Sequence, residues 1–157
     1  YEMLDLGYNF RITDIQAALG DSQLKKLDKF IQSRKSIAKI YDSKFNSNPY
    51  IKTPEVSANV SHAYHLYTIS IDYLAINKSR NQIMHQLRKL NIGSQVLYIP
   101  VNLQTYYLKK YKFVAKNFQN TLNYYNSCLS IPIFADMKSK DAIFIAKQIN
   151  RLIKKDD

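Results

Sequence analysis

The sequence predicts an α+β domain in which helices pack against a small, mostly antiparallel sheet. Three observations support this fold class. Apolar residues recur at helical spacing through most of the first 45 residues and again near the C-terminus. Short stretches rich in β-branched and aromatic residues separate these helical regions. The 157 residues are also about the length of one domain that can bury a core, so we expect a single domain over residues 1–157.

The first predicted element is one long helix, or two nearly continuous helices, over residues 13–45. It begins at Thr13 and Gln16, which have the spacing of a capping box. Gly20 and Asp21 weaken the helix without necessarily ending it. Asn46-Ser47-Asn48-Pro49 ends it. The residues at helical spacing, expected to form its apolar face, are Ile15, Ala18, Leu19, Leu24, Leu27, Ile31, Ala38, Tyr41 and Phe45.

Shorter elements fill the rest of the chain. Strands are predicted over residues 65–72, 94–97 and 129–133, and Pro132 indicates an edge or a strand end. Helices are predicted over residues 79–90, 104–112, 118–128 and 139–153. The first of these ends at a C-cap in the stretch 90–93. In the last helix the residues expected to face inward are Ile143, Ala146, Ile149 and Ile153.

The chain is strongly basic, with 23 Lys and Arg against 12 Asp and Glu and a net charge of +11. Such an excess is typical of proteins that bind nucleic acid or other anions. Here, however, the basic residues are mostly lysines spread along the sequence, so we favour a compositional bias with solvated side chains. The alternative is a basic helical nucleic-acid-binding or interaction-only domain. In it, the tyrosines of 105–107 would stack on bases beside Lys109 and Lys110.

The residues indicate no complete active site of their own. His62 and His65 lack nearby acidic or cysteine ligands, so no metal site is expected. Three glycines are too few for the usual phosphate-cradling loops. The single cysteine, Cys128, lies among apolar residues and reads as a small core residue, and it fits a reducing, cytoplasmic compartment. No run approaches the ~18 apolar residues that span a bilayer, so no membrane partner is expected.

Four segments, in order, resemble one family. GYNFRITDIQAALG at residues 7–20 resembles the start of the C-terminal part of the PLP-dependent sugar aminotransferases of the DegT/StrS family. AYHLYTISID, NIGSQVLYIPVNLQTYY and CLSIPIF continue the match over essentially the whole chain. The resemblance implies the small C-terminal domain of a fold type I aminotransferase. It also implies action on a nucleotide-linked keto sugar, in the synthesis of cell-surface polysaccharide or glycan sugars.

The resemblance also implies roles for individual residues. By matching position, Asn9 would donate its side-chain amide to the phosphate of pyridoxal 5'-phosphate (PLP) held in the partner subunit. Arg11 would lie beside the same phosphate and face the anionic nucleotide-sugar, which Tyr8 would also contact. His65 would lie near the sugar pocket, and Tyr98 on the loop at the substrate entrance. The alternative from the residues alone is that Asn9 and Arg11 are turn and helix-entry residues. His65 would then be a strand-end histidine.

Three further positions bear on the sugar pocket. Tyr67 matches the family as well, but it could equally be a core residue. Many family members have His where this chain has Leu97 and Asn102. Losing two polar groups from a substrate loop predicts weakened sugar recognition or an unusual substrate.

The family's chemistry needs a lysine that forms a Schiff base with PLP, and in the family that lysine lies upstream of the segment at 7–20. Lys25, Lys26 and Lys29 lie on the predicted long helix among other charged residues and are expected to be solvated. We therefore expect the large PLP-binding domain to be absent from this sequence. The chain alone is expected to bind no PLP and to be inactive.

Three origins fit such a chain: a truncated piece of an enzyme, half of a split gene, or a decayed remnant. Its expected partner is a second copy, bound through the N-terminal arm and long helix, or a separately encoded N-terminal half. In a remnant the exposed apolar residues Ile12, Ile15 and Leu19 would drive self-association.

Overall fold

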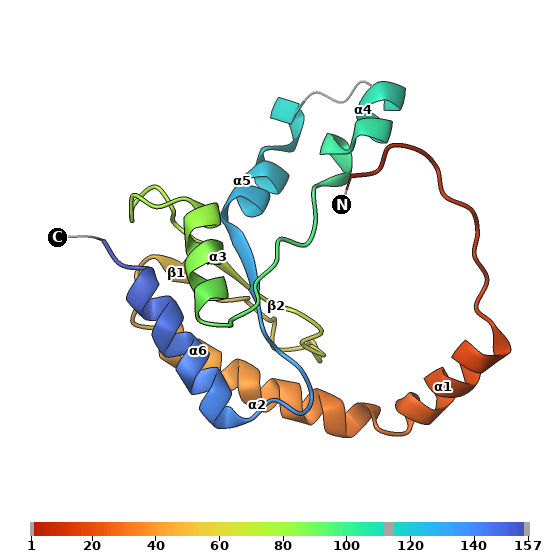
Figure 1. The fold of residues 1–157 in the computed structure, drawn as a ribbon, viewed down its shortest axis with the longest axis horizontal. Helices are drawn as coiled ribbons and strands as arrows, with labels where there is room; N and C mark the ends of the chain where they lie inside the picture. The colour runs from red at the N-terminus through yellow and green to blue at the C-terminus, as the bar shows by residue number, and fades with distance from the viewer. Residues whose placement is uncertain (1, 112–114, 156–157) are drawn as a thin grey trace.

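The computed structural model describes residues 2–111 and 115–155, which form helices around one three-stranded antiparallel sheet (Figure 1). This confirms the predicted α+β class. The elements are α1 (Asp14–Leu24), α2 (Leu27–Phe45), β1 (Ile51–Lys52), β2 (Tyr67–Ile71), α3 (Arg80–Lys89), η1 (Val101–Leu103), α4 (Thr105–Tyr111), η2 (Ala115–Phe118), α5 (Gln119–Ser127), β3 (Cys128–Ile131) and α6 (Ser139–Leu152).

The sheet has the order β1-β2-β3, and one of its faces forms the core. Side chains alternate along β2, so Tyr67, Ile69 and Ile71 point to the same face and are fully buried there. The register brings Leu129 and Ile131 of β3 alongside them. Apolar residues of α2, α3 and α6 pack in the same core. The opposite face of β2 carries the smaller polar side chains of Thr68 and Ser70, which are only partly buried.

Two predicted strands are confirmed and one is wrong. The strands predicted over 65–72 and 129–133 are present as β2 and β3, and Pro132 follows the last residue of β3. The segment 94–97 is not a strand, because it makes a single bridge, from Gln95 to Ser130, before the chain turns toward η1. Only two residues long, β1 is too short to show alternation and was not predicted.

The two N-terminal helices meet at Lys25-Lys26 rather than at Gly20-Asp21. The capping box of α1 is confirmed: Gln16 Oε1 accepts from the Thr13 amide at 2.9 Å, and Thr13 Oγ1 accepts from the Gln16 amide at 3.3 Å. Ala38, Tyr41 and Phe45 of α2 are buried as predicted.

The apolar face predicted for α1 is exposed in the described structure, since α1 has no buried residue. Ile15 is 84% exposed and Leu19 is 62% exposed. Figure 1 gives the reason: α1 projects beyond the sheet and its covering helices, so no other described element packs on it. Leu24 and Leu27, at the junction with α2, are exposed for the same reason.

The inward face of α6 is shifted from the predicted one. Ala146, Ile149 and Ile153 are buried as expected, but Ile143 is 43% exposed. Ala142 and Ile145 take its place in the core. The buried stripe therefore runs through 142, 145, 146, 149 and 153, and Ile143 lies one position outside it.

Helix α3 ends in a Schellman motif, which confirms the predicted C-cap. The Ile92 amide donates to the Leu87 carbonyl at 2.9 Å and the Asn91 amide to the Arg88 carbonyl at 3.0 Å. Asn91 takes the left-handed conformation, with φ 57°, that this motif requires at its C′ position. The motif turns the chain back toward β3, where Gln95 pairs with Ser130.

Tyr67 is a core residue, which settles the alternatives left open for it. Its ring lies 5.0 Å from that of Tyr41, and its hydroxyl donates a hydrogen bond to the Asp42 carboxylate. The Tyr41 hydroxyl donates to the Pro132 carbonyl at 2.8 Å. Burial, and then the hydrogen bond to Asp42, raise the pKa of Tyr67 well above its usual range. These two phenols fasten α2 to the sheet and to the segment after β3.

The α6 register is tested by a matched pair of substitutions. Ile145→Ala removes a buried side chain and is expected to lower the free energy of unfolding by about 2–4 kcal/mol. Ile143→Ala, two residues earlier on the exposed side, should cost less than about 1 kcal/mol. Urea denaturation followed by circular dichroism measures both. Equal losses, or a larger loss at Ile143, would contradict the helix orientation described above.

The buried phenol of Tyr67 predicts sensitivity to alkali. Above about pH 10 the unfolded chain releases this proton while the folded chain retains it, so stability falls as the pH rises. Tyr67→Phe should reduce the slope of unfolding free energy against pH by about 1.4 kcal/mol per pH unit in this range. Tyr124→Phe, at a 54% exposed tyrosine, is the control. An unchanged slope for Tyr67→Phe would show that this phenol ionises freely in the folded chain.

Candidate functional site

The segment before α1 is an exposed arm, which we define as residues 4–13. Figure 1 shows it leaving the neighbourhood of α4 and running outside the rest of the fold to α1. The Phe10 amide donates to the Tyr8 carbonyl at 3.1 Å, which closes a tight three-residue turn centred on Asn9. The rings of Tyr8 and Phe10 meet edge to face, 6.2 Å apart. Asn9 therefore lies at the tip of a turn, and it and Arg11 are exposed.

The arm and α1 expose an unusual amount of apolar surface. Each of these side chains is more than 60% exposed: Leu4, Leu6, Tyr8, Phe10, Ile12, Ile15, Leu19 and Leu24. Large apolar side chains exposed together in one segment are typical of interaction sites in soluble proteins. Ile12, Ile15 and Leu19, the residues singled out from the sequence, belong to this surface.

His65 lies at a pocket of about 700 Å³ on the polar face of the sheet. Thr68 and Ser70 of β2 line it, together with Lys52 from β1 and His62 from the loop before β2. The loop is shaped by Tyr64, which has a φ of 48° and donates its amide to His62 Nδ1 at 3.0 Å. Glu55 also lines the pocket, so its hydroxyl, imidazole and ammonium groups lie with one carboxylate and suit a polar ligand.

Sequence reasoning missed most of this pocket. Thr68 and Ser70 could have been predicted from the sequence. Side chains alternate along a strand, so a strand that buries Tyr67, Ile69 and Ile71 places these two on the opposite face. Lys52 and Tyr124 carried no signal, since both come to the pocket from elements distant in sequence.

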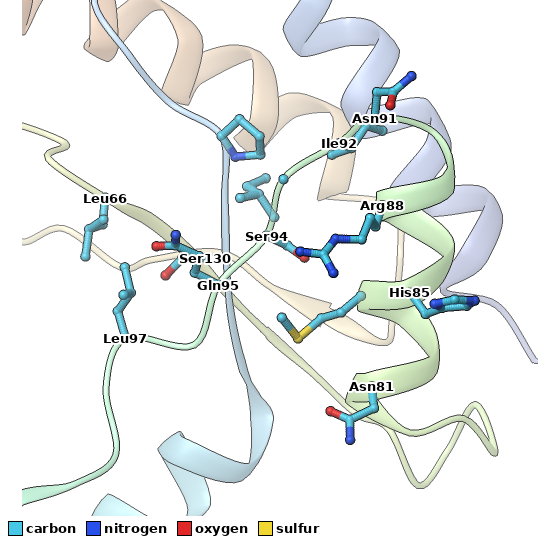
Figure 2. A pocket seen from close by; sticks show the side chains of 14 residues that line it. Leu66, Asn81, His85, Arg88, Asn91, Ile92, Ser94, Gln95, Leu97 and Ser130 are labelled. Carbon is cyan, nitrogen blue, oxygen red and sulfur yellow. The ribbon is translucent and has the colours of Figure 1, made fainter. Parts of the chain in front are cut away.

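A second pocket, of about 800 Å³, lies between α3, the segment 91–97 and β3 (Figure 2). Arg88 extends from α3 at one side, while Gln95 and Ser130 lie together near its middle. Leu97 and Leu66 lie on the other side, and Leu66 lines both pockets. None of the residues that line this pocket is acidic. Leu97, where many family members have His, thus gives the pocket an apolar wall.

Tyr98 and Asn102, the other two positions singled out on the segment after Leu97, lie in different environments. Tyr98 is 60% exposed and lines neither pocket. Asn102, in η1, is only 7% exposed, and its Nδ2 has no hydrogen-bond partner in the described chain. The polar group at position 102 is therefore enclosed by the protein rather than open to a pocket.

The five predicted site residues lie in three places. Tyr8, Asn9 and Arg11 are on the arm, His65 is at a pocket on the sheet, and Tyr98 is on the loop before η1. Neither of the two pockets described above brings these groups together.

The remaining chemical groups are accounted for within the fold. Lys25, Lys26 and Lys29 are exposed, and Lys25 pairs with Asp21 at 3.1 Å. Cys128 is buried, as predicted, and burial raises the pKa of its thiol. The described residues contain no cluster of side chains that could hold a metal ion. Among them, no helix combines the length and the apolar character that crossing a membrane would require.

The tyrosines and lysines of α4, on which the nucleic-acid alternative depends, contact one another. The rings of Tyr107 and Tyr111 stack 5.9 Å apart. Lys110 Nζ lies 5.5 Å from the centre of the Tyr106 ring and 5.4 Å from that of Tyr111. These contacts explain the cluster by packing within the helix, without a ligand.

Comparison with solved structures places this fold among sugar aminotransferases. The aminotransferase PseC of Helicobacter pylori, involved in pseudaminic acid biosynthesis, superposes with a TM-score of 0.82 at 28% identity. The match covers 97% of this chain and 40% of PseC. This confirms the expected fold, a part of a fold type I aminotransferase.

Comparison of sequences agrees. The spore coat polysaccharide biosynthesis protein SpsC of Bacillus subtilis is 34% identical over 155 residues. The UDP-4-amino-4,6-dideoxy-N-acetyl-beta-L-altrosamine transaminase of Campylobacter jejuni is 34% identical over 154 residues. In both cases 98% of this chain is covered but only 40% of the relative, so the chain spans about two fifths of the length of these curated relatives. The model of the DegT/DnrJ/EryC1/StrS aminotransferase family matches residues 1–150, and the chain belongs to this family.

Proposed function

We propose that this chain is the C-terminal part of a PLP-dependent aminotransferase that acts on a nucleotide-linked keto sugar. The observation that carries the proposal is the family match over residues 1–150, which includes the intact segment 7–20. The names of the relatives support the substrate class: one is a transaminase of a UDP-linked amino sugar, and another serves polysaccharide biosynthesis. The corresponding role here is the synthesis of a cell-surface polysaccharide or glycan sugar, in the cytoplasm.

The residues of the arm fit the phosphate end of PLP. Phosphate is bound by preorganised N–H donors and by the planar guanidinium group. The turn at residues 8–10 presents the Asn9 amide at its tip, and Arg11 follows two residues later. In this proposal Asn9 donates to the phosphate, while Tyr8 and Arg11 orient the anionic nucleotide-sugar. His65 and Tyr98 act on the sugar side.

PLP, when bound, would supply the electron sink for transfer of the amino group. The Schiff-base lysine belongs, in this proposal, to a large domain outside this sequence. Lys25 and Lys26 are exposed at the junction of α1 and α2, and Lys29 is exposed on α2. Lys52 lines the pocket that His65 also lines and is the one lysine there. A test of whether the chain alone binds PLP covalently should therefore examine Lys52.

Exposed apolar surface such as that of the arm and α1 is usually buried against a partner. We propose a second copy of the complete protein as the partner, with the arm reaching toward the partner's cofactor. A separately encoded N-terminal half would cover the same surface in a split enzyme. The exposure of eight large apolar side chains over residues 4–24 supports a partner of this kind.

A chimera tests the proposed function. This chain would replace the matching C-terminal region of the Campylobacter jejuni transaminase, whose own upstream part then supplies the large domain. We expect the chimera to bind PLP and to lose its absorbance near 400–430 nm (roughly the range of a protein-bound PLP imine) when glutamate is added. Failure to bind PLP, with both parts folded, would overturn the proposal.

In the same chimera Asn9→Ala should weaken PLP binding by about tenfold, because a charge-assisted hydrogen bond to phosphate is lost. Asn120→Ala, at an exposed position in α5, is the matched control and should leave the affinity unchanged. Fluorescence titration of PLP into the apo-chimera measures both. Equal affinities for the two variants would remove Asn9 from the phosphate site.

The chain alone tests the absence of a Schiff base. After incubation with PLP and reduction with borohydride, we expect mass spectrometry to find no lysine labelled saturably and stoichiometrically. If a label does appear, Lys52→Met decides whether it is on the pocket lysine, and Lys154→Met serves as an exposed control. A stoichiometric label that disappears in Lys52→Met would show that this chain carries its own cofactor site.

A further inference from the structure

Gln104 joins two parts of the chain that lie about one hundred residues apart. Its side-chain Oε1 accepts from the Met3 amide at 2.7 Å, and its Nε2 donates to the Ile99 carbonyl at 3.1 Å. A primary amide can donate and accept at the same time. Since Met3 offers a donor and Ile99 an acceptor, only one orientation of the amide satisfies both.

Neighbouring residues strengthen this connection. The Tyr106 amide donates to the Met3 carbonyl at 3.0 Å, and the Thr105 hydroxyl donates to the Glu2 carboxylate. We call these contacts of Gln104, Thr105 and Tyr106 with Glu2 and Met3 the clamp. The clamp ties the chain just before the arm to the beginning of α4.

On its other side the clamp reaches the loop that carries Tyr98. The Ile99 carbonyl belongs to this loop, next to the exposed tyrosine. The Leu103 amide donates to the Pro100 carbonyl at 2.8 Å and the Gln104 amide to the Val101 carbonyl at 3.2 Å. The short turn of η1 therefore transmits the position of Gln104 directly to residues 99–101.

The arm depends on the clamp because it has few other supports. Residues 4–13 are all exposed, and the arm is anchored at one end by the clamp and at the other by the capped start of α1. The position of the turn at Asn9 is set by these two ends.

We propose that Gln104 is a positioning residue that couples the loop of Tyr98 to the arm of Asn9 and Arg11. This inference rests on the proposed function for its catalytic meaning, but the coupling itself is a property of this chain. A displacement of either segment is carried to the other through one side-chain amide. Binding of substrate against the loop and binding of cofactor against the arm are then linked.

Hydrogen exchange of the chain tests the clamp without any catalysis. Gln104→Met keeps the length of the side chain and removes both hydrogen bonds. We expect exchange of the Met3 and Tyr106 amides to accelerate about tenfold, while the buried Ile149 amide in α6 stays unchanged. Gln86→Met, at an exposed glutamine of α3, is the matched control.

Gln104→Glu separates the two bonds. At neutral pH the carboxylate still accepts from Met3 but repels the Ile99 carbonyl, so only the Leu103 and Gln104 amides should lose protection. Near pH 4 the protonated carboxyl can again donate and accept, and protection should return. The unsubstituted chain, measured in parallel, corrects for the titration of Glu2 in the clamp.

Three results would overturn the proposal. One is unchanged exchange at Met3, Leu103 and Tyr106 in both variants. Another is an equal acceleration at Ile149, which would reduce Gln104 to a contributor to overall stability. The third, decisive even if Gln104→Glu unfolds at low pH, is an identical neutral-pH pattern in the Met and Glu variants.

The effect of Gln104 on cofactor and substrate binding is measured in the chimera. There Gln104→Met should raise both the Kd for PLP and the KM for the sugar, whereas Asn9→Ala should raise the Kd for PLP without raising the KM. If Gln104→Met changed only the Kd or only the KM, the proposed coupling between loop and arm would be contradicted. Failure of the unsubstituted chimera to bind PLP would refute the proposed function and leave the exchange result standing.

Discussion

The structure depends on the contact between the apolar face of the sheet and helices α2 and α6. Tyr67 is at the centre of this contact, with its ring against Tyr41 and its hydroxyl on Asp42. Because side chains alternate along β2, burying Tyr67, Ile69 and Ile71 on one face leaves Thr68 and Ser70 on the other. One packing choice thus produces both the core and the polar wall of the pocket at His65.

The same core explains why the proposed functional groups lie at the periphery. The arm takes no part in the core, and its exposed groups are held only where the chain is anchored. The loop of Tyr98 leaves the sheet after the single bridge at Gln95. An enzyme assembled from several chains or domains needs such groups to extend beyond the lobe that carries them. A rigid lobe with exposed extensions is a physical arrangement suited to a site that other surfaces complete.

Local signals in the sequence predicted most elements, because their causes are local. The capping box at Thr13 and the turn at Asn91 involve residues at most five positions apart. Pro132 marked the end of β3 because proline cannot donate to the ladder. The resemblance carried by residues 7–20 identified the family and, through it, the fold.

What could not be predicted depends on distant partners. The apolar residues of α1 have the spacing of a packed helix face, and only the structure shows that no described element lies against them. Ile143 and Ile145 are both apolar, so the sequence alone could not choose between them in α6. The pocket lysine Lys52 and the amide of Gln104 act across the fold, at sequence separations where spacing carries no information.

The junction of α1 and α2 has a mechanical consequence. Lys25 and Lys26 both keep backbone angles close to helical, and no side-chain hydrogen bond caps the start of α2. The direction of α1 is therefore governed by the torsion angles of two solvated residues. Helix α1 has 11 residues, so it is a rod of about 16 Å, and a rotation of about 20° at its base sweeps its far end through roughly 6 Å. Evolution could re-aim this lever to suit differently shaped neighbours while leaving the lobe untouched.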